Sequence, residues 1–573
     1  MTPETPDVQA PRKAAGEPVA PQRESICNIA SSLPQMAATV PEQAAIVLTA
    51  GRGGKGAAGC PRLTFAELEA LSNRYAGGLC DAGIERGMRT LLMVRPGFEF
   101  FGLTFALFKI GAVPVLIDPG MGVRQMLRCV RNVEPQALIG IPPAQAMRVL
   151  RPAAFQSVRR VVTVGRRWFW GGPTLGELAA RGGDRFEPAA TTADEVAAVL
   201  FTSGSTGPAK GVVYEHGMFA AQVRWLQSHY GIEAGEIDLP AFPLFALFDA
   251  AMGMTAVIPD MDPSHPARVD PAKIVQAIHE HGVTNTFGSP AIWNRVSAYC
   301  VQHGLKLPSI RRILIAGAPV PLPVLERLGQ ALSPTADVHT PYGATEALPV
   351  SSITGREVLE EHGVRSRTGA GTCVGRPLPE VSLRVIRISD DPIEQWSDDL
   401  ALPAGQTGEF VVAGDMVTRE YHGLPRATAL AKIRDGDTFR HRMGDVGYVD
   451  ETGRLWFCGR KAHRVVTAWG TMFTVPCEAV FNEHPDVFRS ALVGVGRSGE
   501  QRPVLVVEPE PGRFPRGSRL RSFARELLDL GRANELTRDV HDVLFHRGFP
   551  VDVRHNAKIN REKLAVWAED RLR

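Results

Sequence analysis

Residues 200–217, LFTSGSTGPAKGVVYEHG, concentrate the side chains and glycines that could bind an anion. Glycine lets backbone amides turn inward around an anion, and hydroxyl groups can add hydrogen bonds. We assign this function to Thr202, Ser203, Gly204, Ser205, Thr206, Gly207 and Lys210. The segment is not a Walker loop, because Ala209 precedes the lysine and the β-branched run GVVYE follows it. A glycine-rich hairpin turn without a ligand is the alternative.

The elements around this loop follow a βα pattern. RTLLMV at 89–94 predicts a strand. Lys109, Gly111 and Pro114 divide the apolar stretch 98–117, which is too interrupted to span a membrane, into a helix of about three turns and a short buried strand ending at Asp118. The same alternation recurs between residues 270 and 340. Repeated βα units predict parallel sheets covered by helices, with ligands beyond the carboxyl ends of the strands.

The pattern changes after residue 372 to short alternating runs with turn signals, which indicate antiparallel hairpins. A basic segment, GRKAHRV at 459–465, precedes a last stretch that suits a small α+β domain. We therefore predict an α/β fold in three parts: a disordered tail (1–25), a large domain of parallel-rich sheets with a β-rich subdomain (26–460), and a small mobile domain (461–573).

Composition limits the possible partners. The chain has 573 residues and a formal net charge of +3, which gives no reason to expect nucleic acid or an anionic membrane as the main partner. Its eight cysteines form no CxxC pair and suit reduced thiols. The amino terminus lacks the apolar core of a signal peptide. These features predict a cytoplasmic protein without a transmembrane segment.

The string TSGSTGPAK at 202–210 resembles the signature of the adenylate-forming superfamily, which includes acyl-CoA synthetases, peptide-synthetase adenylation domains and luciferases. Two later segments fit the same family. IAGAP at 315–319 resembles the segment that lines adenine, which implies that Gly317, Ala318 and Pro319 do so here. TPYGATE at 340–346 resembles the next motif. It implies that Tyr342, with Gly343, contacts the adenine, that Thr345 reaches the α-phosphate, and that Glu346 helps to hold Mg²⁺ together with Thr206.

Two more segments extend the resemblance to residues 30–565. RMGDVGYVDETGRLWFCGR resembles the ribose motif, so Asp445 is expected to accept from the ribose hydroxyls and Arg460 to add a ribose or phosphate contact. RHNAKINREKL resembles the final motif, which implies that Lys558 enters the active site during adenylate formation. The resemblance implies ATP and Mg²⁺ as cofactors, with Lys558, Thr345 and Glu346 as catalytic residues. A basic surface helix is the alternative for Lys558, since Ala557 replaces the family's usual glycine.

The chain departs from thioester-forming relatives at three places. Ala462 occupies the hinge position, where Asp or Lys is common, and TAWGTMFTVPCEAVF lacks the glycine pattern expected where a pantetheine arm approaches. Phe245 and Ala246 stand where many relatives carry a histidine. Phe245, Phe248 and Trp293 are predicted to line an apolar substrate pocket, although such residues are often simple core.

These segments look most like the olefin-pathway β-lactone synthetases of bacterial long-chain hydrocarbon biosynthesis. The resemblance implies that a long-chain 2-alkyl-3-hydroxy acid is adenylated and that its own hydroxyl then closes a β-lactone ring. It also implies an assembly with hydrolase-fold and reductase proteins of that pathway. The alternatives are a long-chain acyl-CoA or acyl-carrier ligase and an inactive nucleotide-binding scaffold. Asp249 and His216 lie near these motifs and could accept the hydroxyl proton, but both suit structural roles.

Overall fold

Two large sheets are built from strands that lie between residues 44 and 339. The computed structural model describes residues 26–49, 59–201, 209–551 and 558–573. The predicted tail (1–25) lies outside these ranges. The first sheet has the order β6-β5-β3-β4-β7-β8 and is parallel except for β8, which pairs antiparallel with β7. Its strands are β3 (Arg89–Met93), β4 (Val113–Ile117), β5 (Ala137–Gly140), β6 (Arg160–Thr163), β7 (Val196–Phe201) and β8 (Gly211–Glu215).

The second sheet has the order β13-β12-β11-β9-β10-β1-β2 and is parallel except for β2. Its strands are β1 (Ala44–Leu48), β2 (Arg62–Thr64), β9 (Ile237–Pro240), β10 (Thr255–Ile258), β11 (Asn285–Gly288), β12 (Arg312–Ile315) and β13 (Asp337–His339). This parallel-rich α/β arrangement confirms the predicted fold class.

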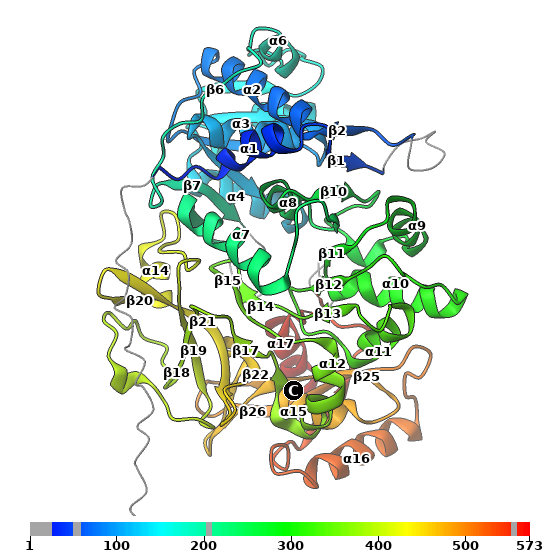
Figure 1. Cartoon of the computed structure of the whole chain (residues 1–573). Coiled ribbons are helices and arrows are strands. Elements are labelled where there is room, and N and C mark those ends of the chain that lie inside the picture. The colour runs from blue at the N-terminus through cyan, green and yellow to red at the C-terminus, as the bar shows by residue number, and fades with distance from the viewer. Residues whose placement is uncertain (1–25, 50–58, 202–208, 552–557) are drawn as a thin grey trace, which may run out of the picture.

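Helices cover both sheets, as Figure 1 shows. In this view the first-sheet elements lie at the top, and α9, α10 and α11 lie to the right. The helices of this part are α1 (Ser32–Thr39), α2 (Phe65–Asp81), α3 (Phe98–Ile110), α4 (Val123–Val133), α5 (Pro142–Leu150), α6 (Leu175–Ala179), α7 (His216–Tyr230), α8 (Ala246–Met252), α9 (Pro271–His281), α10 (Pro290–His303) and α11 (Leu322–Ala331).

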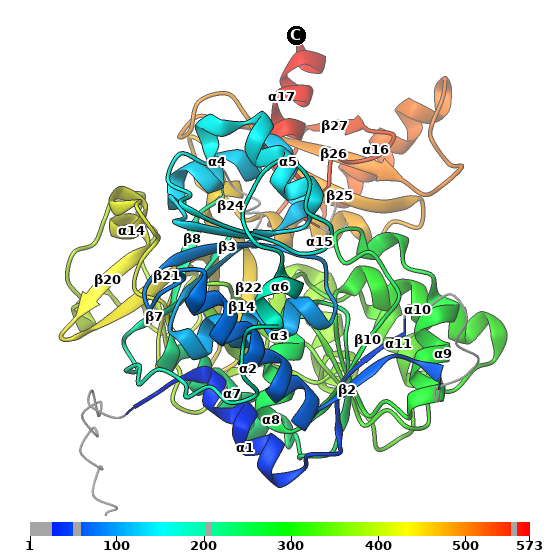
Figure 2. The ribbon, with the colours of Figure 1, turned by 90° about the horizontal axis from the view of Figure 1, so that it is seen from above.

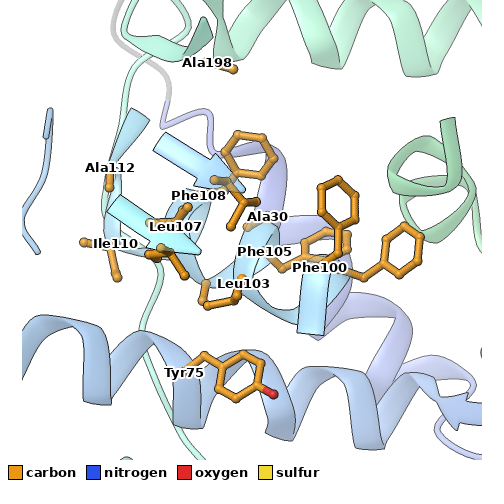
Figure 3. Packing of buried hydrophobic residues seen from close by; sticks show 14 of the residues in the cluster. Ala30, Tyr75, Phe100, Leu103, Phe105, Leu107, Phe108, Ile110, Ala112 and Ala198 are labelled. Carbon is orange, nitrogen blue, oxygen red and sulfur yellow. The ribbon is translucent and has the colours of Figure 1, made fainter. Parts of the chain in front are cut away.

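The apolar run predicted as helix and strand is α3 followed by β4. The side chains of α3 gather between Tyr75 of α2 and Ala198 of β7 (Figure 3). Lys109 is fully buried in this helix, and its ammonium group lies 2.6 Å from the carboxylate of Glu69 and 2.8 Å from the hydroxyl of Ser72. Gly111 ends the helix at φ 75°, a conformation that suits glycine. In the described part of the chain, no helix has the length and apolarity needed to cross a membrane.

The β-rich part, predicted after residue 372, begins earlier in the structure, at residue 342, and runs to residue 460. A small sheet contains β14 (Tyr342–Ala344), β15 (Ala347–Ser352) and β17 (Arg376–Pro377). A larger antiparallel sheet contains β16 (Thr372–Cys373), β18 (Ser382–Ile386), β19 (Gly408–Ala413), β20 (Lys432–Asp435), β21 (Thr438–Val449) and β22 (Leu455–Arg460). The helices of this part are α12 (Gly355–Glu357), α13 (Gly363–Arg365) and α14 (Pro425–Ala431).

The last 110 or so residues follow a one-turn 3-10 helix at Lys461–His463. They contain a short hairpin, β23 (Val465–Val466) and β24 (Thr471–Met472), and a three-stranded sheet, β25 (Val487–Val495), β26 (Arg502–Pro509) and β27 (Asp542–Phe545). The helices are α15 (Thr474–Asn482), α16 (Ser518–Arg532) and α17 (Arg561–Leu572). In Figure 2, α16, α17 and β25–β27 lie at a different edge of the molecule from α9–α11.

Candidate active site

A cavity of about 1120 Å³ lies at the carboxyl ends of the parallel strands. Its walls include residues just after β4, β9, β11 and β12, and Phe201 at the end of β7, as expected for ligand sites in parallel sheets. The β-rich part and the segment before α17 complete it. Seven residues predicted from separate motifs line this cavity: Lys210, Gly317, Gly343, Thr345, Glu346, Arg460 and Lys558.

The predicted anion loop connects two paired strands. It joins β7 to β8, and the register Phe201↔Gly211 closes the hairpin. Lys210 lines the cavity, and its ammonium nitrogen lies 4.5 Å from the ring centroid of Tyr421. The assignments to Thr202, Ser203, Gly204, Ser205, Thr206 and Gly207 fall outside the described residues.

Tyr342, Asp445 and Arg460 form a connected group. Asp445 and Arg460 are cross-strand partners on β21 and β22, with Arg460 Nη1 3.0 Å from Asp445 Oδ1. The hydroxyl of Tyr342 donates to Asp445 Oδ2 at 2.6 Å. Burial raises the pKa of Asp445, while the positive charges of Arg460 and Lys558 oppose that rise. Among the described residues, none donates a hydrogen bond to Asp445 Oδ1, so this buried oxygen can accept one from a ligand hydroxyl.

Thr345 and Glu346 lie in the turn between β14 and β15. Tyr214 donates to the carbonyl of Thr345, and Thr418 donates its backbone N–H to the carbonyl of Glu346 at 2.9 Å. The Glu346 side chain accepts from the Tyr421 hydroxyl at 2.6 Å. Tyr421 therefore connects Glu346 to Lys210, a contact that the sequence did not reveal.

Gly317, Ala318 and Pro319, the predicted adenine-lining segment, directly follow β12 and its next residue Ala316, and of the three only Gly317 is among the cavity-lining residues. Gly317 lines the cavity and has φ 94°, a region that favours glycine. Lys558 also lines the cavity and lies just before Ile559, which is buried and bridges to Val551. Two segments more than 200 residues apart thus meet at one site.

The cavity walls also include two groups of apolar side chains. The α3 side contains residues that pack with the first sheet: Leu92, Val94, Phe100, Leu116, Leu244 and Leu247. The α7 side contains residues that pack beneath α7 and α8: Leu226, Tyr230, Ile232, Phe248, Met252 and Leu314. Phe245 stacks on Phe287 at 3.6 Å between ring centroids and lies 5.8 Å from Phe248. Phe245 and Phe248 therefore reach the cavity, as predicted.

The structure places Trp293 elsewhere. Trp293 is only 1% exposed and packs in the core of the second sheet, while its neighbour Ile292 lines the cavity. The indole lies behind Gly288, where an added Cβ would come within 2.9 Å of Trp293 Nε1. Trp293 supports the wall rather than forming it.

His216 has a structural position. It begins α7, is buried beside Phe108, and its Nδ1 accepts from the backbone N–H of Ile29 at 3.3 Å. It is not among the cavity-lining residues, whereas Asp249 is. Of the two residues considered for the hydroxyl proton, only Asp249 faces the cavity.

Burial gives His216 a measurable effect on stability. Desolvation lowers its pKa from 6.5 to about 4. The unfolded chain binds this proton near pH 6.5 and the folded chain near pH 4, so stability is lost as pH falls through that window, by up to about 1.4 kcal/mol per pH unit. We expect His216→Gln to melt below the wild type at pH 7, with the difference shrinking toward pH 4.5. Parallel melting curves across this range would contradict a buried neutral imidazole.

The site offers few side chains for a metal ion. In the described ranges, no group of three or more His, Cys, Asp or Glu side chains is placed to hold one. Glu346 contributes one carboxylate to the cavity. Mg²⁺ usually binds through one or two carboxylates plus phosphate oxygens and water, so this donor set fits a metal that arrives with a nucleotide.

Comparisons with known proteins agree with this geometry. A family model described as AMP-binding enzyme matches residues 34–422. The olefin beta-lactone synthetase of Xanthomonas campestris pv. campestris is 49% identical over 552 residues, covering 95% of this chain and 98% of the relative. The olefin beta-lactone synthetase of Stenotrophomonas maltophilia is 50% identical over 561 residues, covering 95% and 99%.

A solved structure extends the comparison to the fold. The anthranilate CoA ligase in complex with anthranoyl-AMP has a TM-score of 0.75 at 17% identity, covering 96% of this chain and 98% of its own. At this identity the likeness concerns the fold alone. The sequence matches establish that this chain belongs to the AMP-binding enzyme family, together with the olefin beta-lactone synthetases.

Proposed function

We propose that this enzyme converts a long-chain 2-alkyl-3-hydroxy acid into a β-lactone, with release of AMP and diphosphate. The two relatives that share about half of their residues with this chain are both named olefin beta-lactone synthetase, which is the reaction proposed here. The structural observation that supports this substrate is the cavity with two apolar sides, because an acid branched at C2 has two chains to bury. Each buried methylene contributes about 0.8 kcal/mol.

In the first step the substrate carboxylate attacks the α-phosphate of ATP, which gives an acyl-adenylate and diphosphate. We assign Lys558 to the space between the two anions, where its charge offsets their repulsion. Thr345 contacts the α-phosphate, and Asp445 with Arg460 holds the ribose. The adenine lies between two segments of the chain, Tyr342 with Gly343 and the run Gly317, Ala318 and Pro319. Lys210 and the hydroxyls of the 202–207 segment bind the departing phosphates. Glu346, with Thr206, would hold Mg²⁺, which neutralises phosphate charge when bound.

In the second step the 3-hydroxyl oxygen attacks the acyl carbon. The new C–O bond closes the four-membered ring, the bond to the phosphate oxygen breaks, and AMP leaves with that electron pair, while the hydroxyl proton passes to the departing phosphate or to water. The hydroxyl and the acyl carbon belong to one molecule, and well-oriented intramolecular attack can reach an effective molarity of roughly 10⁵ to 10⁸ M, so holding the hydroxyl beside the acyl carbon favours ring closure. No thiol acceptor is needed.

We also infer that residues 461–573 form a separate mobile domain, and that the enzyme works in the cytoplasm beside hydrolase-fold and reductase proteins.

Product analysis tests this proposal against the thioester alternative. Purified enzyme is incubated with a 2-alkyl-3-hydroxy acid and Mg·ATP, with and without coenzyme A, and the product is identified by NMR. We expect β-lactone and AMP in equal amounts in both reactions. A requirement for coenzyme A, or a thioester product, would instead establish the long-chain acyl-CoA ligase.

The Tyr421 hydroxyl provides a test of the Glu346 site. Tyr421→Phe keeps the ring beside Lys210 but removes the hydrogen bond to Glu346. We expect kcat/KM for ATP to fall about tenfold, the size of one lost hydrogen bond to a charged group, and the half-saturating Mg²⁺ concentration to rise.

Tyr448→Phe is the matched control, because the Tyr448 hydroxyl donates to the Ala370 carbonyl at 3.0 Å and the residue does not line the cavity. Both variants are titrated with Mg²⁺ at saturating ATP. An unchanged Mg²⁺ dependence in Tyr421→Phe would rule out an orienting role for its hydroxyl.

A further inference from the structure

The α7 side of the cavity contains a buried polar cluster, which we define as Asp238, Asp249 and Asn285. Their exposed fractions are 1%, 3% and 3%. All three line the cavity, yet none belongs to the motifs that bind nucleotide. Apolar side chains surround them, including Phe248, which precedes Asp249 on α8, and Phe287, two residues after Asn285 on β11.

The cluster is internally bonded but incomplete. Asn285 Nδ2 donates to Asp238 Oδ1, and Asp249 donates to the Asp238 carboxylate. Burial raises the pKa of both carboxyl groups, which keeps a proton on Asp249. Within the described part of the chain, Asp249 Oδ2 and Asn285 Oδ1 have no hydrogen-bond partner. Two buried acceptor oxygens at a cavity wall require a donor from outside the protein.

Strand register places this cluster at depth. Asn285 pairs with Asp238 and with Arg312 at the beginning of their strands, whereas Gly288 and Ile315 lie at the carboxyl ends beside Gly317. Three residues of strand separate the two levels, or about 10 Å at 3.3 Å per residue. The reacting groups Thr345, Glu346 and Lys558 belong to the nucleotide end of the cavity. The cluster therefore lies deeper in the cavity than the strand ends beside Gly317.

We infer that the Asp238–Asp249–Asn285 cluster is a polar subsite that selects the end of one substrate chain. A plain alkyl chain long enough to reach the cluster would leave its two buried acceptor oxygens without a hydrogen-bond donor. Substrates with such chains therefore bind poorly. A chain that ends above it leaves room for water, and a chain that carries a terminal hydroxyl donates to Asp249 Oδ2 or Asn285 Oδ1. This inference rests on the proposed function for the identity of the chains.

Diphosphate release with a series of substrates tests the subsite. One chain of the 2-alkyl-3-hydroxy acid is held short while the other is lengthened by two carbons at a time, and then the roles are exchanged. For one of the two chains, we expect kcat/KM to rise with length and then to fall at least tenfold at a single step. At that chain length, adding a terminal hydroxyl to the substrate should raise kcat/KM of the wild-type enzyme at least tenfold.

Two substitutions complete the test. Asp249→Asn keeps a donor for Asp238 and an acceptor oxygen, so the length limit should stay. Asp249→Leu removes the acceptor, so the limit should move by at least two carbons or disappear. No fall in either series, an unchanged limit in Asp249→Leu, or no gain from the terminal hydroxyl would overturn the inference. Because diphosphate release reports only the first step, an enzyme that adenylates without forming lactone would refute the proposed function and leave this test intact.

Discussion

Lys558→Ala is expected to lower the rate of diphosphate release by about 10²- to 10³-fold, the range found when a single group that stabilises developing charge is removed. Lys558 lines the same cavity as Thr345, Glu346 and Arg460, and its charge reaches Asp445. Two anions must meet in the first step, and Lys558 is the cation that we assign to this step. Lys461, which also lines the cavity, is paired with Glu409. Its removal should affect kcat more than KM for ATP, because the need for this charge is greatest in the transition state.

Lys563→Ala is the matched control for this prediction. Lys563 carries the same charge five residues later, but it is exposed on the first turn of α17 and does not line the cavity. We expect wild-type diphosphate release from this variant and unchanged melting temperatures for both. Chemically prepared acyl-adenylate should restore lactone formation in Lys558→Ala, since the lysine is assigned to the first step. Wild-type diphosphate release by Lys558→Ala would refute that assignment.

Local pattern predicted much of this site because its motifs are contiguous. The loop before Lys210 lies between two paired strands, as its flanking β-branched residues indicate. The apolar stretch predicted as a helix and a buried strand is indeed a helix at 98–110 and a strand at 113–117, with Gly111 between them. Fold class followed from the same alternation of strands and helices. These features depend on residues close together in the chain.

Features that depend on distant pairing were not predictable. Trp293 was assigned to the pocket, but neighbouring helical positions point about 100° apart, and the phase of α10 turns Ile292 to the cavity instead. The Asp238–Asp249–Asn285 cluster exists only because β9 and β11 pair in one register. Tyr421 reaches Lys210 through a bridge to Val212 on the strand after the loop. No short sequence pattern specifies such contacts.

Asp445→Asn is expected to remove most of the enzyme's preference for a ribose over a deoxyribose. Asp445 is 3% exposed, its Oδ2 accepts from Tyr342, and its Oδ1 forms an ion pair with Arg460 at 3.0 Å but makes no hydrogen bond within the described residues. A ribose hydroxyl is the donor that the proposed function supplies. A hydrogen bond to a charged group contributes about 1.5–3 kcal/mol, so the wild type should use ATP roughly 10- to 100-fold better than 2′-deoxy-ATP in kcat/KM.

Measuring ATP and 2′-deoxy-ATP with both the wild type and Asp445→Asn separates the loss of the ribose contact from a general loss of nucleotide binding. Asp445→Asn also leaves the Arg460 charge without its partner, which should raise KM for both nucleotides, but only the lost ribose contact should bring the two values together. Tyr342→Phe is the control: it removes the hydroxyl that donates to Asp445 Oδ2 and keeps the ring and the carboxylate, so the preference for ATP should persist. If Asp445→Asn still distinguished ATP from 2′-deoxy-ATP as well as the wild type does, another group would have to bind the 2′-hydroxyl, and Asp445 would act only as the counter-ion of Arg460.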